Sequence, residues 1–196
     1  MSSLIQKSAG SVPIPAYAIK VFEGRKFSIY QWEQPGANGV MQKFEKARKR
    51  GGVAVIPVTE EGEILLIDEV KNSMSVVSLP TGGVDDGEDV LAAAQRELLE
   101  ETGYVSDDWE LWFSYEKDSH IDSLSHVFVA RGATPIRKGD LGINGEKIRI
   151  KPVDFEQFVH FASDERFRNS YLIPKILQAR LNPDRMEDLY KLLYKS

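Results

Sequence analysis

The chain of 196 residues contains no cysteine, so neither a disulfide framework nor a zinc–thiolate site is available to it. It has no run of about 18 apolar residues, the length that a membrane-spanning helix requires. Its formal net charge is −5, whereas nonspecific binding of nucleic acid needs a basic surface. We therefore expect neither a membrane nor a nucleic acid as a partner. A nucleotide substrate stays possible, because metal ions can supply the positive charge.

The first residues, MSSLIQKSAGSVPIPAY, lack the order of charged and then apolar residues that marks a signal peptide. We therefore expect a cytoplasmic protein. The hydrophobic content of 42% is enough to build a core. Length and composition together predict one compact domain with room for a small N-terminal unit.

Apolar periodicity and turn residues predict a mixture of strands and helices. Two strands are expected within residues 16–33, a turn at 34–39, and either a third strand or a short helix at 40–48. Further strands are expected at 52–57, 64–69 (the hairpin partner of the first), 74–79, 109–115, 123–130 and 146–152, and helices at 154–162, 170–181 and 183–194. The elements alternate without regular βαβ spacing, which favours an α+β fold with a mixed sheet.

The stretch GGVDDGEDVLAAAQRELLEETGY at residues 82–104 carries the most chemical information. Glu97, Glu100 and Glu101 lie three and four residues apart, so on a helix they share one face and repel each other. Each such pair costs roughly 0.2–0.5 kcal/mol unless something lies between the charges. A hard cation such as Mg²⁺ takes oxygen ligands and would turn this repulsion into a binding site.

A helix is expected here, because residues 88–101 contain neither proline nor glycine and Gly103 suits a left-handed C-terminal cap. The three acids then lie in its last two turns, the end at which the helix dipole disfavours negative charge. The alternative is an acidic face that is merely solvated, as is usual for Glu-rich helices. The glycine-rich entry, Arg96 and Gly103 at fixed offsets favour a metal site instead.

The spacing of these residues resembles the complete Nudix box: Gly82, five residues, Glu88, seven residues, and then Arg96 to Tyr104. The resemblance extends roughly over residues 50–160. It implies an α/β/α sandwich and an enzyme that hydrolyses a nucleoside diphosphate linked to another group, with Mg²⁺ or Mn²⁺ as the cofactor.

The same resemblance assigns roles within the box. It makes Glu97, Glu100 and Glu101 the metal ligands, with the backbone carbonyl of Thr81 as a further candidate. It also pairs Arg96 with Glu88, so that Arg96 orients a ligating glutamate.

A general base must also reach the attacking water. In several Nudix subfamilies this base is a glutamate on a loop well after the box, and here Glu146 in DLGINGEKIRI is the candidate and a further possible metal ligand. The alternative is that Glu146 merely begins an exposed strand. The acids that compete for the role are Glu116, Asp118 and Asp122 in another loop, and Glu100 or Glu101 on the helix.

The order of elements is similar to that of ADP-ribose and nucleoside-diphosphate-sugar pyrophosphatases. This similarity implies an N-terminal arm and strand unit at residues 1–48, through which the chain forms a homodimer, and a hydrolase domain at residues 49–196. It also places Arg50 and Lys71 where phosphate-binding residues occur, although a lysine cannot give the bidentate contact of an arginine. Phe27, among the aromatic residues of the strand unit, could stack on a base, and Gly82 and Gly83 would border the substrate. The alternative is that these aromatic residues pack the strands together.

The exact substrate stays open, because ADP-ribose pyrophosphatases tend to have a proline after the box, and this chain has none between Tyr104 and Pro135. ADP-ribose, ADP-glucose or GDP-mannose would fit. The alternatives are hydrolysis of nucleoside triphosphates or dinucleoside polyphosphates, or a noncatalytic domain that senses a nucleotide sugar.

Overall fold

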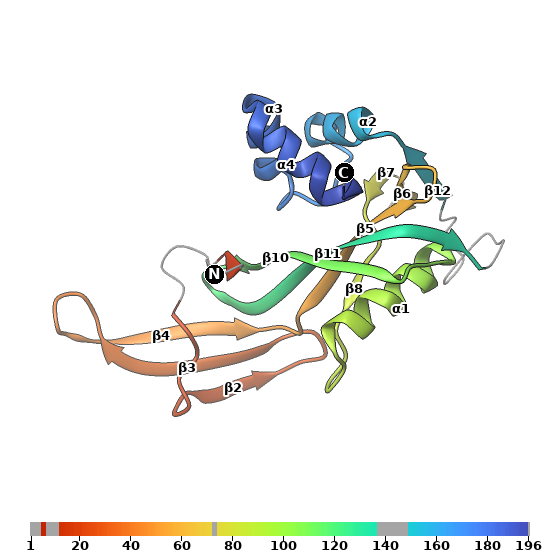
Figure 1. Cartoon of the computed structure of the whole chain (residues 1–196). Coiled ribbons are helices and arrows are strands. Elements are labelled where there is room, and N and C mark those ends of the chain that lie inside the picture. Colours follow the sequence, from red (N-terminus) through yellow and green to blue (C-terminus); the bar gives the residue numbers. More distant parts are fainter. Residues whose placement is uncertain (1–4, 7–11, 72–73, 137–148, 196) are drawn as a thin grey trace.

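The computed structural model describes residues 5–6, 12–71, 74–136 and 149–195, and Figure 1 shows its arrangement. A mixed sheet runs through the molecule, with helix α1 on one side and helices α2, α3 and α4 on the other. This is the α+β architecture that the sequence predicts. No helix within these described ranges is long and apolar enough to cross a membrane.

The sheet has the strand order β12-β6-β5-β11-β4-β3-β2, with the shorter strands attached at its sides. The strands are β1 (Ile5–Gln6), β2 (Ile19–Glu23), β3 (Ser28–Pro35), β4 (Met41–Arg48), β5 (Gly52–Thr59), β6 (Ile64–Lys71), β7 (Met74–Ser78), β8 (Thr81–Gly83), β9 (Tyr104–Val105), β10 (Asp108–Asp118), β11 (Ile121–Pro135) and β12 (Arg149–Val153). Residues 40–48, which the sequence left open, form strand β4, because they pair along their whole length with β3.

Strand β5 is the centre of the fold, because its side chains are buried on both faces. Val53 and Val55 pack against α1 (Val90–Thr102), whereas Ala54, Ile56 and Val58 belong to the larger core beneath α2–α4. Burial on both faces explains why this strand reads as a continuous apolar run. Its neighbour β11 is parallel, and the short strand β8 runs antiparallel to it.

The strands differ from the expectation in three respects. The turn at 60–62 joins β5 and β6 in an antiparallel hairpin as expected, but their pairing ends after Thr59–Glu63 and Val58–Ile64, and β6 pairs mainly with β7 and β12. Strand β8 was not expected, because three residues with two glycines carry no periodic signal. Strand β11 is also longer than expected, since its ends pair with β4 and β9, which lie far apart in the sheet.

The C-terminal region forms α2 (Phe155–His160), a 3₁₀ turn η1 (Phe161–Ser163), α3 (Ile173–Leu181) and α4 (Pro183–Tyr194). Asp154 and Gln157 form a reciprocal capping box at the start of α2. Helix α4 begins where expected, with Asn182 as its cap and Pro183 in its first turn. Helix α3 begins three residues later than expected, because residues 170–172 form tight turns in which the N–H of Leu172 donates to the carbonyl of Asn169 and the N–H of Ile173 donates to that of Ser170.

The packing of α4 onto the core yields a stability prediction. Leu193 is fully buried in α4, whereas Leu181 at the end of α3 is 86% exposed. Leu193→Ala should lower the free energy of unfolding by about 2–5 kcal/mol, because it leaves a cavity. The matched control Leu181→Ala should change it by less than about 0.5 kcal/mol. Urea unfolding followed by circular dichroism measures both, and equal losses would show that α4 is not part of the core.

Candidate active site

Helix α1 places the predicted acidic residues next to strand β8. Asp89 caps its first turn by accepting hydrogen bonds from the backbone N–H groups of Leu91 and Ala92. Gly103 ends the helix in the left-handed conformation at a φ of 72°, which glycine adopts without strain. Both ends are therefore set by local sequence, and α1 packs against β8 and β5 along its length.

The closest approach between α1 and β8 is at Glu97 and Gly82. A Cβ atom on Gly82 would lie 1.8 Å from the Cδ atom of Glu97, so no side chain other than glycine's hydrogen fits there. Glu97 is 9% exposed, and this burial raises the pKa of its carboxyl group, although Arg96 opposes the shift. Additional positive charge is favourable beside a buried carboxylate.

Arg96 connects the loop, the helix and β8. Its Nε and Nη2 atoms donate to the two carboxylate oxygens of Glu88 at 2.9 and 3.0 Å. Nη2 also donates to the carbonyl of Gly83 at 2.9 Å, and Nη1 donates to Glu97 at 2.6 Å and to Glu100 at 3.4 Å. The Arg96 guanidinium is the main reason why the pKa of Glu88 falls to about 2. The structure thus places Arg96 against Glu88, as the sequence predicts.

Glu101 lies one turn further along α1 and holds the start of β8. Its Oε2 atom accepts a hydrogen bond from the backbone N–H of Thr81 at 2.8 Å. The short strand is therefore attached to α1 at both ends, at Thr81 through Glu101 and at Gly83 through Arg96. This brings the predicted residues of the box, including the backbone of Thr81, into one cluster.

In the described parts of the chain, no three side chains of Asp, Glu or His are already placed to share one cation. The reason is visible in the contacts: Arg96 engages Glu97 and Glu100, and Thr81 engages Glu101. The cluster nevertheless fits a divalent hard cation, because its donors are oxygen atoms and the buried Glu97 lies against Gly82, which has no side chain to cover the carboxylate on that side. Three carboxylates around one guanidinium also leave an excess of negative charge.

Among the described residues, Arg50, Phe27 and Lys71 take no part in these hydrogen bonds around the glutamates of α1. Arg50 points to the box entry, where its Nη1 atom is 2.8 Å from Asp85, but both side chains are more than half exposed and such pairs contribute little. Phe27 lies in the turn between β2 and β3 and is 39% exposed. Lys71 is the last residue of β6. Glu146 lies outside the described residues.

One aromatic residue of the strand unit and two of the acids considered as alternatives for the base have partners outside the cluster. Trp32 is buried and stacks on Phe44 at 5.9 Å, so it packs the N-terminal strands together. Asp122 pairs with Arg48 at 2.7 Å, and Asp118 accepts from the backbone N–H of His120. These two acids stabilise the β10–β11 hairpin and its contact with β4.

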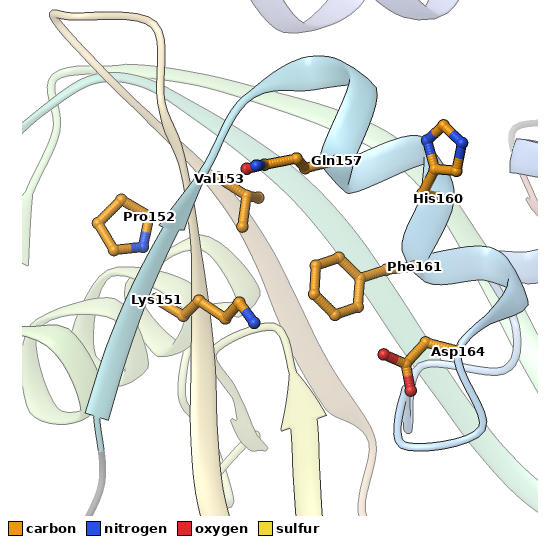
Figure 2. Close-up of a pocket in the computed structure, with 7 residues that line it drawn as sticks. All are labelled: Lys151, Pro152, Val153, Gln157, His160, Phe161 and Asp164. Atoms are coloured by element: carbon orange, nitrogen blue, oxygen red, sulfur yellow. The ribbon is translucent and has the colours of Figure 1, made fainter.

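A hollow of about 370 Å³ lies away from the predicted residues, between β12 and the α2–η1 segment. Figure 2 shows its lining residues: Lys151, Pro152, Val153, Gln157, His160, Phe161 and Asp164. The Lys151 ammonium lies 5.1 Å from the centre of the Phe161 ring, and Asp164 pairs with Arg166. None of the residues of the box contributes to it, so this hollow and the carboxylate cluster are separate features.

Comparison with known proteins identifies the family to which this chain is similar. The model of the NUDIX domain matches residues 48–175. A methanol dehydrogenase activator of Bacillus methanolicus is 36% identical over 157 residues, which cover 77% of this chain and 83% of that protein. An ADP-ribose pyrophosphatase of Bacillus subtilis (strain 168) is 32% identical over 114 residues, covering 57% of this chain and 62% of that protein.

Among solved structures, an ADP compounds hydrolase matches with a TM-score of 0.68, over 84% of this chain and 90% of the other. Its sequence identity is 22%, so this match shows the fold alone.

The contact at Gly82 yields a prediction with a matched control in the next residue. Gly82→Ala should displace the Glu97 carboxylate and lower the free energy of unfolding by about 1–3 kcal/mol, the usual cost of overpacking. Gly83→Ala should change it little, because a Cβ there meets nothing within 4 Å. Urea unfolding compares the two variants, and similar values would contradict the close approach of α1 to β8.

Proposed function

Because this chain belongs to the Nudix family and is a Nudix pyrophosphohydrolase, we propose that it hydrolyses the pyrophosphate bond of a nucleoside diphosphate sugar. ADP-ribose, ADP-glucose and GDP-mannose are the substrates of this class that we would test first. The products would be a nucleoside monophosphate and a sugar phosphate. The observation that carries the proposal is the buried Glu97 against Gly82, with Glu100 and Glu101 on the same helix. The relative named as an ADP-ribose pyrophosphatase supports the choice of substrate class.

In this proposal Glu97, Glu100, Glu101 and the carbonyl of Thr81 hold Mg²⁺ or Mn²⁺. When bound, the cation supplies Lewis acidity and lowers the pKa of a coordinated water. Arg96 orients Glu97 through the hydrogen bond between them. The guanidinium is itself fixed by one hydrogen bond to Gly83 and two to Glu88.

The remaining roles rest on the sequence. Glu146 remains the proposed general base and a possible further ligand. Arg50 and Lys71 would contact the phosphates, Phe27 would stack on the base, and Gly82 and Gly83 would border the substrate.

A second candidate function has a specific observation behind it. The methanol dehydrogenase activator covers most of this chain at 36% identity, and its name describes an effect on another enzyme. The chain could thus regulate a partner dehydrogenase, with or without hydrolysis. Hydrolysis is favoured, because a purely sensing domain has no need to keep every acid of the box. Nucleoside triphosphates and dinucleoside polyphosphates are further substrates to be distinguished.

The test is product release from ADP-ribose, ADP-glucose, GDP-mannose, UDP-glucose, diadenosine polyphosphates, CoA and deoxynucleoside triphosphates, with and without Mg²⁺ or Mn²⁺. We expect metal-dependent release of a nucleoside monophosphate and a sugar phosphate, lost on chelation. Binding of a nucleotide sugar without turnover would favour the sensing role instead.

Glu97→Gln should lower kcat at least roughly 100-fold with the thermal unfolding curve preserved, because the amide cannot hold the cation as the carboxylate does. Glu187→Gln removes one negative charge from an exposed position on α4 and is the matched control. Steady-state kinetics on the best substrate of the panel compares both variants. Activity near wild type in Glu97→Gln, with the fold intact, would refute the proposed site.

We also propose that the strand unit at residues 1–48 forms a homodimer and that the protein is cytoplasmic. Strand β2 lies at the end of the sheet order, and all five of its residues are exposed, including Ile19 (68%), Val21 (50%) and Phe22 (57%). An apolar sheet edge of this kind needs a cover, and a second copy of the chain supplies one.

Val21→Lys should therefore shift the protein from dimer to monomer, because it places a charge within the contact. Val70→Lys is the control, since Val70 is a similarly exposed valine (60%) on β6. Light scattering after size exclusion measures the molar mass. A monomeric wild type, or a Val21→Lys variant that stays dimeric, would contradict this role of β2.

A further inference from the structure

The segment between η1 and α3 lies along the outer edge of β7. The backbone N–H of Val77 donates to the carbonyl of Arg166 at 2.9 Å, and the N–H of Arg168 donates to the carbonyl of Val77 at 3.0 Å. Phe167 faces Val77 in an isolated parallel bridge. This pairing brings Asn169 level with Leu79, the residue that follows β7 and leads into the box.

Asn169 is 3% exposed, and both ends of its amide are engaged. Its Oδ1 atom accepts a hydrogen bond from the backbone N–H of Leu79 at 2.8 Å, and its Nδ2 atom donates to the hydroxyl of Tyr171 at 2.6 Å. Because a backbone N–H can only donate, the amide oxygen must face Leu79, which fixes the orientation of the side chain.

Leu79 depends on this bond because its strand has ended. The last residue of β7 is Ser78, which pairs with Ile67 of β6, and Leu79 lies beyond this ladder. Leu79 is fully buried, so water cannot satisfy its N–H group. A buried N–H without a partner is costly, and a side chain 90 positions away in the sequence supplies the acceptor.

The residues after Leu79 lead into β8 and the carboxylate cluster. Pro80 has a fixed φ and no N–H, and its carbonyl accepts from the N–H of Val55 at 3.0 Å. The N–H of Thr81 then donates to Glu101 at 2.8 Å. Three consecutive residues are thus held by three different parts of the molecule: Leu79 by the C-terminal segment, Pro80 by β5 and Thr81 by α1.

Tyr171 holds Asn169 from the other side. Its ring stacks on Tyr115 of β10 with 4.4 Å between the ring centres. Burial strongly raises the pKa of Tyr171. Its hydroxyl oxygen accepts the hydrogen bond from the Asn169 amide.

We propose that Asn169 is a positioning residue for the reaction. By accepting the hydrogen bond from the Leu79 N–H, it fixes the position of Thr81 and Gly82 relative to the carboxylates of α1. This rests on the proposed function, because it assigns Asn169 to the same cation site. Asn169 does not contact the reacting atoms. It acts through the backbone of Leu79–Gly82, whose carbonyl at Thr81 is a proposed ligand and whose Gly82 lies against Glu97.

The test compares Asn169→Leu, Asn169→Asp and Tyr171→Phe in the full-length protein. Asn169→Leu keeps the size of the side chain but removes the acceptor. Asn169→Asp keeps an acceptor for Leu79 and can also accept from the Tyr171 hydroxyl. Tyr171→Phe keeps the bond to Leu79 and removes only the support behind it. Thermal unfolding, Mn²⁺ binding by calorimetry without substrate, and kcat and KM are measured for each.

We expect Asn169→Leu to bind Mn²⁺ at least about 10-fold more weakly, as is usual when a residue that orients a metal ligand is removed. Its kcat should fall by a larger factor than its KM changes. Asn169→Asp should restore much of the Mn²⁺ affinity. Tyr171→Phe should lose thermal stability but keep Mn²⁺ affinity and kcat, which separates positioning from general destabilisation.

The inference is overturned if Asn169→Leu is folded and binds Mn²⁺ as the wild type does. It is also overturned if Asn169→Asp loses as much affinity as Asn169→Leu, or if the wild type binds no Mn²⁺. If Asn169→Leu does not fold, Asn169→Ala, which also removes the acceptor, is measured in its place against Asn169→Asp, and the same outcomes decide. A wild type that binds Mn²⁺ but turns over no substrate would refute the proposed function, while the Mn²⁺ affinities would still decide the role of Asn169.

Discussion

The contact between Glu97 and Gly82 is the constraint on which the site depends. A carboxylate loses solvation when it is placed against a sheet, and this cost is reflected in the raised pKa of Glu97. The contact is possible because Gly82 has no Cβ and so leaves space for the carboxylate. Arg96 offsets part of the lost solvation with a hydrogen bond of 2.6 Å. The hydrogen bonds from Thr81 to Glu101 and from Arg96 to Gly83 keep α1 and β8 together on either side of this contact.

Arg96 balances only part of the negative charge around it. It serves Glu88 with two hydrogen bonds, and Glu97 and Glu100 with one each, so a single positive charge is shared among three carboxylates. Glu101 adds a fourth, engaged by a backbone N–H that carries no full charge. For stability alone this arrangement is poor, since acids at the C-terminal end of a helix oppose its dipole. A binding site for a cation gives the arrangement a physical reason, and it explains why the family resemblance and the local electrostatics lead to the same residues.

The sequence predicts the parts of this structure that depend on neighbours in the chain. The helix α1 with Gly103 as its cap, the turn at 34–39 and the start of α4 at Pro183 each follow from local residues. The sequence could not predict strand β8, because what makes Gly82 necessary is a carboxylate fifteen positions later in a different element. It also missed the extended course of the segment before α3, which is set by hydrogen bonds to β7 and not by any periodicity of its own.

The same distinction explains why the box alone is an incomplete description of the site. The helix face that carries its acids can be predicted from their spacing, but the position of Thr81 depends on contacts with two distant parts of the chain. Glu101 holds it from the side of α1, and Asn169 holds Leu79 from the side of the C-terminal helices. The C-terminal helices pack onto the larger core, so the position of strand β8 depends on that core as well. If the proposed cation site is correct, a change in the packing of the C-terminal region should therefore alter cation binding without touching any residue of the box.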